Sequence, residues 1–174
     1  MMTWVWLIAG IILLMIGAVF TVGALLPRDH VATRSVWLKQ PASEIWKIIR
    51  EVKSLPQWRS GVTQVDGLTG EAVSPSGWVE HSGKDQLKIV VASEQTPNQL
   101  VTRIDDDQLP FGGTWTYDLS ETNGGTLLRI TEAGFVKPAP FRFIARFLIG
   151  HTKTMEGYLK DLAAKTANDV RIEP

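Results

Sequence analysis

The sequence has no cysteine, no net charge and no charged side chain before Arg28. The lack of cysteine excludes disulfide bonds, thiolate metal sites and a cysteine nucleophile, but it does not identify the redox compartment. The 18 Lys and Arg residues balance the 18 Asp and Glu residues, so no basic field favours nucleic acid as a partner. All of these charges lie in residues 28–174, which divides the chain into an apolar N-terminal stretch and a polar remainder.

Motifs that identify a metal, phosphate or nucleophile site are also missing. The histidines, His30, His81 and His151, are scattered and lack a ligand spacing such as His-Glu-x-x-His. Asp105–Asp107 lacks the glycine and the distal glutamate of a calcium loop, so we expect a charged turn there. The chain has no phosphate-binding loop and no nucleophile elbow. We therefore expect no metal and no cofactor.

The N-terminal stretch Trp4–Leu25 is uncharged throughout. A helix of about 22 residues rises about 33 Å, close to the thickness of the hydrocarbon core of a bilayer. Trp4 and Trp6 at one end suit the headgroup interface, and Pro27 follows the other end. A signal peptide has a basic n-region and a shorter apolar core, and a helix of a soluble domain would need a polar face toward water, which this all-apolar stretch lacks. We therefore expect a transmembrane helix with residues 4–26 in the membrane.

This helix predicts a single-pass membrane protein with an anchor at residues 1–27 and one domain at residues 28–174. Arg28, Arg34 and Lys39 follow the helix, and only the α-amino group precedes it. The positive-inside rule then places the domain in the cytoplasm.

The domain is expected to begin with a strand and a helix pair, continue with strands and end with a long helix. The expected elements are a strand at Val31–Gln40, a helix at Pro41–Val52, a short helix or turn at Ser54–Trp58, strands at Val62–Leu68, Gly77–Ser82, Gln86–Glu94, Gln99–Asp105, Thr114–Ser120 and Thr126–Phe135, and a long helix at about Pro140–Ala167.

Short turns between these strands favour antiparallel pairing in one sheet of about seven strands. The long helix is the only element large enough to cover the apolar face of that sheet, with an inward stripe of Ile144, Leu148, Met155, Leu159 and Leu162. A sheet that curves around one helix leaves a space between the two, and that space is the natural ligand site.

Several segments resemble the START/polyketide-cyclase-like (SRPBCC, Bet v 1-like) superfamily. The segments that carry the resemblance are Pro41–Trp46 with Leu55–Trp58, and, for one uncharacterised branch, Leu109–Tyr117, Gly125–Glu132, Phe141–Phe143 and Gly150–Met155. The resemblance covers nearly all of residues 30–166 and implies an α+β helix-grip fold, with a curved antiparallel sheet around a long C-terminal helix. Its members include lipid and sterol carriers, ubiquinone-binding proteins, plant hormone-binding proteins and polyketide cyclases. The N-terminal helix is not part of the shared domain.

Alternation along the strands indicates which side chains face the space. Leu87 alternates with Lys88, and the apolar residues that follow continue the inward set. We expect the ligand site to include Trp58, Trp78, Ile89, Val91, Arg103, Trp115, Tyr117, Ile130, Glu132 and Leu148. Tryptophan can line a pocket or simply fill the core, and both readings stay open for Trp58, Trp78 and Trp115.

Two charged candidates have alternatives. Glu132 shares the inward face with Ile130 and would act as an acid, a base or a hydrogen-bond anchor; the alternative is a structural pair with Arg142 or Arg146. Arg103 would bind an acidic headgroup of a ligand, or it lies on the solvated face of its strand. Of the neighbours Glu80 and His81, one faces inward, and the sequence does not say which.

The segment Pro140–Ile149 is unusually apolar, with Arg142 and Arg146 one helical turn apart. It suits a membrane interface or a lid over the cavity, or it is simply buried by the sheet.

Three functions follow from these patterns. The leading hypothesis is a membrane-anchored module that binds a hydrophobic small molecule, such as a lipid or quinone, under the long helix. The second is a cyclase, hydratase or dehydratase with Glu132 as acid or base and Tyr117 or Arg103 polarising a carbonyl. The third is an interaction module without a ligand, whose side chains fill the cavity and leave no pocket of roughly 300 Å³ or more.

Overall fold

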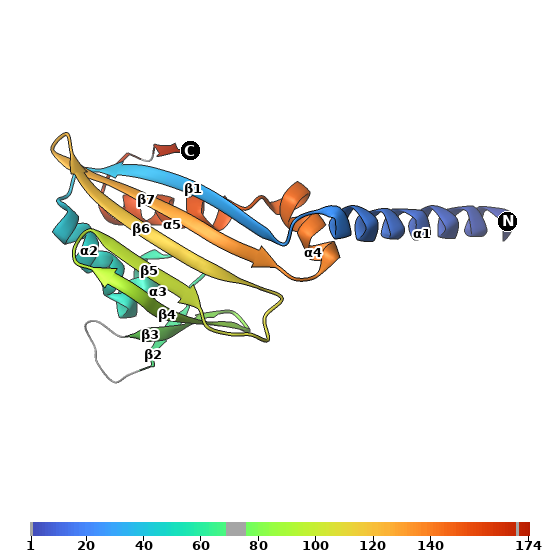
Figure 1. The fold of residues 1–174 in the computed structure, drawn as a ribbon, viewed down its shortest axis with the longest axis horizontal. Coiled ribbons are helices and arrows are strands. Elements are labelled where there is room, and N and C mark those ends of the chain that lie inside the picture. The colour runs from blue at the N-terminus through green and yellow to red at the C-terminus, as the bar shows by residue number, and fades with distance from the viewer. Residues whose placement is uncertain (1, 69–75, 170) are drawn as a thin grey trace.

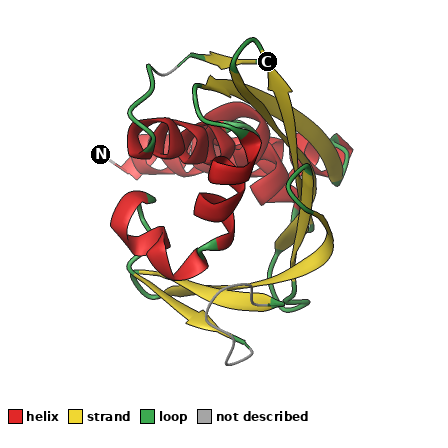
Figure 2. Cartoon of the chain, turned by 90° about the vertical axis from the view of Figure 1, so that its left-hand side faces the viewer, coloured by secondary structure: helices red, strands yellow, loops and turns green. Residues whose placement is uncertain are grey.

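One curved antiparallel sheet forms the framework of the domain (Figures 1 and 2). The computed structural model describes residues 2–68, 76–169 and 171–174, and within these residues the sheet has eight strands in the order β2-β3-β4-β5-β6-β7-β1-β8. The strands are β1 Asp29–Leu38, β2 Gln64–Gly67, β3 Gly77–Ser82, β4 Asp85–Gln95, β5 Gln99–Ile104, β6 Phe111–Thr122, β7 Gly125–Val136 and β8 Ile172–Glu173.

The helices lie at the N-terminus, after β1 and after β7. They are α1 Met2–Leu25, α2 Ala42–Arg50, the 3-10 helix η1 Val52–Ser54, α3 Leu55–Trp58, α4 Ala139–Ile144, the π-helix η2 Ala145–Ile149 and α5 Lys153–Lys165. Figure 1 shows α1 extending away from the domain, with α4 beside its C-terminal end. The α+β helix-grip expectation is confirmed.

The core forms where α2 and α5 press their apolar faces against the concave side of the sheet. The largest cluster joins side chains of both helices to the inner faces of β1, β5, β6 and β7, among them Val36, Leu38, Ile45, Leu100, Leu128, Ile130, Met155, Leu159 and Leu162. Full burial of one such side chain stabilises the fold by about 1.5–3 kcal/mol, so this cluster holds the helices on the sheet.

The prediction of one long helix over Pro140–Ala167 is wrong. The chain breaks at Gly150, whose φ of 81° lies in the left-handed region that glycine adopts without strain. Before the break, α4 and η2 contain no buried residue, and after it α5 lies on the sheet with Met155, Leu159 and Leu162 fully covered. The expected stripe is therefore correct for α5 and wrong for Leu148, which is 73% exposed.

Candidate functional site

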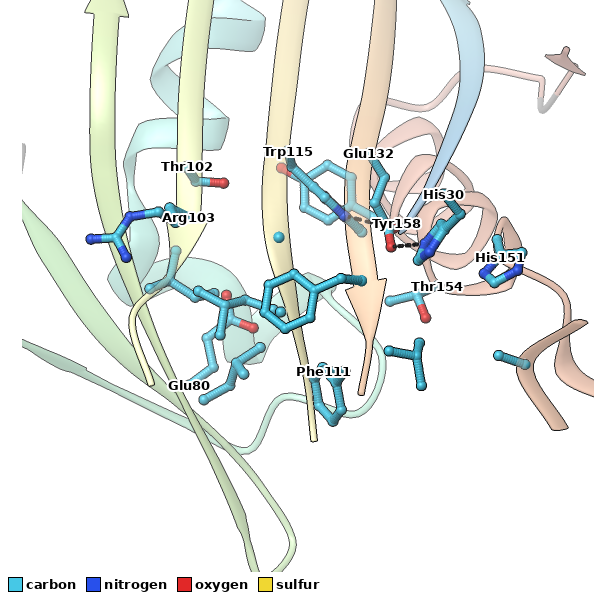
Figure 3. A pocket seen from close by; sticks show the side chains of 18 of the residues that line it. His30, Glu80, Thr102, Arg103, Phe111, Trp115, Glu132, His151, Thr154 and Tyr158 are labelled. Atoms are coloured by element: carbon cyan, nitrogen blue, oxygen red, sulfur yellow. Dashed lines mark hydrogen bonds and ion pairs between the residues drawn. The ribbon is translucent and has the colours of Figure 1, made fainter. Parts of the chain in front are cut away.

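A cavity of about 440 Å³ lies between the concave face of the sheet and the segment α4–η2–α5. Its walls come from the inner faces of β3 to β7, from His30 of β1 and from Tyr158 of α5. Figure 3 shows side chains from these elements converging on one space. Apolar and aromatic side chains make up most of the wall, and a few polar groups interrupt it.

Six of the ten residues expected at the ligand site line this cavity, and these are Trp78, Ile89, Arg103, Trp115, Tyr117 and Glu132. The other four do not. Trp58, Val91 and Ile130 belong to the packed core around it, and Leu148 points to solvent from η2. Leu148 fails because the break at Gly150 turns its helix away from the sheet.

Arg103 borders the cavity but directs its charge elsewhere. Figure 3 shows its guanidinium pointing away from the other side chains. Its Nη2 donates to Asp105 Oδ1 at 2.7 Å, and half of its side chain is exposed. Lys88 binds the same carboxylate at 2.8 Å, and these two cations lower the pKa of Asp105. Arg103 therefore lines the cavity as expected, but its charged group pairs with Asp105 and is half-exposed, as the solvated-face alternative describes.

Glu132 faces the cavity and is held by two partners from neighbouring strands. The indole Nε1 of Trp115 donates to Oε2 at 2.8 Å, and His30 Nε2 lies 3.0 Å from Oε1 (Figure 3). The expected partner Arg142 instead donates to the backbone oxygen of Leu26 at 2.7 Å, because α4 packs beside the end of α1. The alternative pairing of Glu132 with an arginine of the final helix is wrong.

Two histidines complete this polar cluster. The rings of His30 and His151 stack with centroids 3.9 Å apart and an angle of 26° between their planes. Partial burial lowers the pKa of His151, and the charge of His30 acts in the same direction, whereas Glu132 opposes it. His151 is therefore a neutral ring near pH 7 and can accept or donate one hydrogen bond.

A second polar cluster lies on β3, which three other strands separate from β7 in the sheet. Arg59 Nη1 donates to Glu80 Oε2 at 2.6 Å, and Trp78 Nε1 donates to Oε1 at 2.9 Å. The Glu80 side chain is only 6% exposed, so this is a buried ion pair with both carboxylate oxygens occupied. Of the neighbours Glu80 and His81, Glu80 is the inward one.

Buried tyrosines connect the two clusters. The ring of Tyr158 contacts the rings of Tyr117 and Trp115, with centroid distances of 5.7 and 5.9 Å. The guanidinium carbon of Arg59 lies 5.3 Å from the centroid of the Tyr158 ring. Burial raises the pKa of both phenols, and the nearby charge of Arg59 only partly opposes this. Both hydroxyl groups therefore stay protonated at neutral pH and can donate hydrogen bonds.

Sequence reasoning did not place Arg59, His30, His151 or Tyr158 at the site, and it left open whether Glu80 or His81 faces inward. Arg59 carries no local pattern, because its partner is 21 residues away in the chain. Tyr158 did carry a signal, since it follows Met155 by three positions and precedes Leu162 by four, which is the spacing of one helical face. Among the residues described, no group of three His, Cys, Asp or Glu side chains could hold a metal ion.

Comparison with known proteins agrees with this architecture. The family model for polyketide cyclase/dehydrase and lipid transport proteins matches residues 29–168. No curated protein matches the chain.

Among solved structures, a START superfamily protein of Mycobacterium smegmatis is 19% identical, with a TM-score of 0.65 over 79% of this chain and 97% of that one. A conserved protein of Geobacillus kaustophilus is 15% identical, with a TM-score of 0.67 over 83% and 100%. A norcoclaurine synthase point mutant of Thalictrum, in complex with a transition-state analogue, is 10% identical, with a TM-score of 0.64 over 82% and 97%. Likeness at these identities shows the fold alone.

Proposed function

Because the chain belongs to the polyketide cyclase/dehydrase and lipid transport family, we propose that it is a membrane-anchored module that binds an apolar or amphipathic small molecule in the cavity. The observation that carries this proposal is the cavity itself, about 440 Å³ in volume and walled mainly by apolar and aromatic side chains. Ligand pockets of this size and character bury most of a small molecule and orient it through a few polar groups.

The polar groups define the kind of ligand. Trp115, Glu132 and His30 form one hydrogen-bonding cluster in the wall, and Arg59 with Glu80 forms another. Both clusters are already internally paired, so a fully charged ligand headgroup would have to break existing bonds. A lipid, a quinone or a similar molecule with an apolar body and a carbonyl or hydroxyl group suits this wall better.

The anchor in this proposal is α1. The segment Trp4–Leu25 is long and apolar enough to cross a membrane, and none of its most apolar window is buried against the domain. We assign residues 1–27 to the anchor and residues 28–174 to the binding domain. Arg28, Arg34 and Lys39 follow the span, so the positive-inside rule assigns the domain to the cytoplasm of a single-pass protein.

The test is native mass spectrometry of the full chain extracted from its own membranes, with a matched pair of variants. Leu87 lines the cavity, whereas the adjacent Gln86 is exposed on the opposite face of β4. We expect a recurring bound small molecule on the wild-type chain and on Gln86→Trp, and its loss from Leu87→Trp, whose indole occupies the cavity. Wild-type protein that is consistently empty would contradict the proposal.

A second function, catalysis of the cyclase, hydratase or dehydratase type, is favoured by one specific observation. A carboxylate and an imidazole, Glu132 and His30, lie within hydrogen-bonding distance in the cavity wall. Such a pair can move a proton, while the protonated phenol of Tyr117 would polarise a carbonyl. Glu132→Gln separates the two functions, because an enzyme would lose turnover while a binding module would keep its bound ligand. The third hypothesis needs a filled interior, which the open cavity does not provide.

A further inference from the structure

Two segments that are distant in the chain, the end of α1 with its connection to β1 and the β7–α4 connection, meet where α1 joins the domain (Figure 1). The last turn of α1 packs on the start of α4 so closely that a Cβ at Gly23 would collide with the backbone oxygen of Ala139. Arg142 of α4 donates to the Leu26 oxygen at 2.7 Å, and the Val136 amide at the end of β7 donates to the Arg28 oxygen at 2.9 Å. These contacts fix the position of α4 relative to the proposed membrane span.

The segment α4–η2 exposes large apolar side chains at this place. Phe141 is 51% exposed, Phe147 57%, Leu148 73% and Ile149 55%. The segment 139–149 contains two charged side chains, Arg142 and Arg146, and both are basic. Arg146 is exposed beside these apolar side chains, whereas Arg142 is bonded to the end of α1. Exposed apolar side chains next to an arginine are typical of segments that lie in the headgroup layer of a bilayer. In water, the same side chains would leave several hundred Å² of apolar surface uncovered.

The cavity reaches the surface at this same end. Phe141 and Ile149 line it from α4–η2, and Phe111 lines it from the start of β6, although about half of each side chain is exposed. Phe111 lies opposite Val136 in the β6–β7 pairing, and the amide of Val136 donates to the oxygen of Arg28, the last residue between α1 and β1. The rim of the cavity is therefore built from partly exposed apolar side chains next to the membrane span.

We propose that α4–η2 lies in the interfacial layer of the phospholipid bilayer that α1 spans, and that the mouth of the cavity faces that lipid. The inference rests on the proposed function, and specifically on the insertion of α1. It adds a route for the ligand, which passes from the bilayer past Phe111 and Phe141 into the cavity without crossing water. An apolar molecule that moves between two apolar environments in this way avoids the free-energy cost of hydration.

Site-directed spin labelling of the full chain tests this proposal, because the absence of cysteine allows one label at a chosen position. The variants are Leu148→Cys on η2, Phe111→Cys on the rim and Thr122→Cys as a control. Thr122 is the exposed last residue of β6, and the β6–β7 hairpin end lies at the end of the sheet opposite α1 (Figure 1). Phe141→Cys, on the other side of the mouth, replaces Phe111→Cys should that variant fold poorly.

Each labelled chain is reconstituted in phosphatidylcholine–phosphatidylglycerol vesicles, and relaxation of the label by oxygen is compared with relaxation by a water-soluble nickel chelate. We expect oxygen to relax the labels at positions 148 and 111 more strongly than the nickel chelate does, and the nickel chelate to relax the label at position 122 more strongly than oxygen does. Equal ratios at all three positions would overturn the proposal. Oxygen dominance at 148 but not at the rim would overturn the route while leaving the interfacial segment in place.

Alkaline carbonate extraction of the same vesicles separates this inference from the proposed function. A chain that resists extraction but carries a water-exposed label at position 148 keeps its anchor and refutes the interfacial position of α4–η2. A chain that is extracted refutes the anchor, and the inference fails with it.

Discussion

The buried ion pair between Arg59 and Glu80 gives the sharpest prediction of stability. Replacement of Glu80 by leucine removes both hydrogen bonds that the carboxylate accepts, from Arg59 at 2.6 Å and from Trp78 at 2.9 Å. The side chain of Arg59 is only 17% exposed, so in this variant its guanidinium would stay largely buried without a counter-charge. Breaking such a pair from one side costs about 3 kcal/mol, and the unpaired indole N–H adds about 1 kcal/mol.

The assay is thermal unfolding of the full chain in detergent micelles, followed by near-UV circular dichroism. A loss of about 4 kcal/mol corresponds to a fall in Tm of roughly 8–16 °C for a domain of this size. The double variant Arg59→Leu with Glu80→Leu should recover most of the loss, because no charge is then left buried. Asp66→Asn, at the exposed His81–Asp66 pair on the neighbouring strand, is the control and should leave Tm unchanged. A Glu80→Leu variant as stable as the wild-type chain would refute the reasoning.

The remaining predictions concern two kinds of titration and the core. Burial raises the pKa of both tyrosines of the chain, Tyr117 and Tyr158. The folded protein should therefore show no rise in tyrosinate absorbance near pH 10, and the rise should accompany unfolding. A normal tyrosine titration of the native state would contradict the burial of the two phenols. The pKa of His151 is lowered in the folded protein, so its contribution to stability is fully present above the unfolded value of about 6.5 and is lost as the pH falls through the folded value. In urea unfolding at pH 7.5 and 5.0, His151→Gln should therefore lose less free energy of unfolding between the two pH values than the wild-type chain does. Equal losses for the two proteins would contradict the lowered pKa. Leu159 is fully buried between α5 and the sheet, and Leu159→Ala should lower the free energy of unfolding by about 3 kcal/mol in the same urea assay, whereas a loss below about 1 kcal/mol would mean that the core relaxes around the deleted atoms.

Strand alternation predicted much of the cavity wall because the sheet obeys a period of two. Trp115, Tyr117 and Glu132 lie on adjacent strands with their side chains on one face, in the registers Trp115↔Glu132 and Tyr117↔Ile130. Val91 also lies on the inner face, where it packs against the core, and the register shift of β4 against β5 begins only after it, between Val91 and Ser93. Ile130 was placed on the correct face, but α5 covers it completely, and alternation does not distinguish a packed position from an open one.

Other parts of the site depend on contacts that local sequence does not encode. The final helix was expected to be continuous, but it breaks at Gly150, which adopts a left-handed conformation, and a glycine within a helical pattern does not by itself distinguish a break from a helical position. Arg59 and Glu80 come from different elements, and nothing near either residue identifies the other. His30 and His151 are 121 positions apart (151 minus 30) and meet because β1 and the start of α5 lie together.

The connection between α1 and β1 consists of Leu26, Pro27 and Arg28, and the carbonyl oxygens of Leu26 and Arg28 accept hydrogen bonds from α4 and from the end of β7. Three residues span at most about 10 Å, so the domain has almost no reach beyond the end of α1. In the membrane-anchored function proposed above, this short connection would keep the domain at the surface of one bilayer. A ligand bound there would need a second protein to carry it to another membrane.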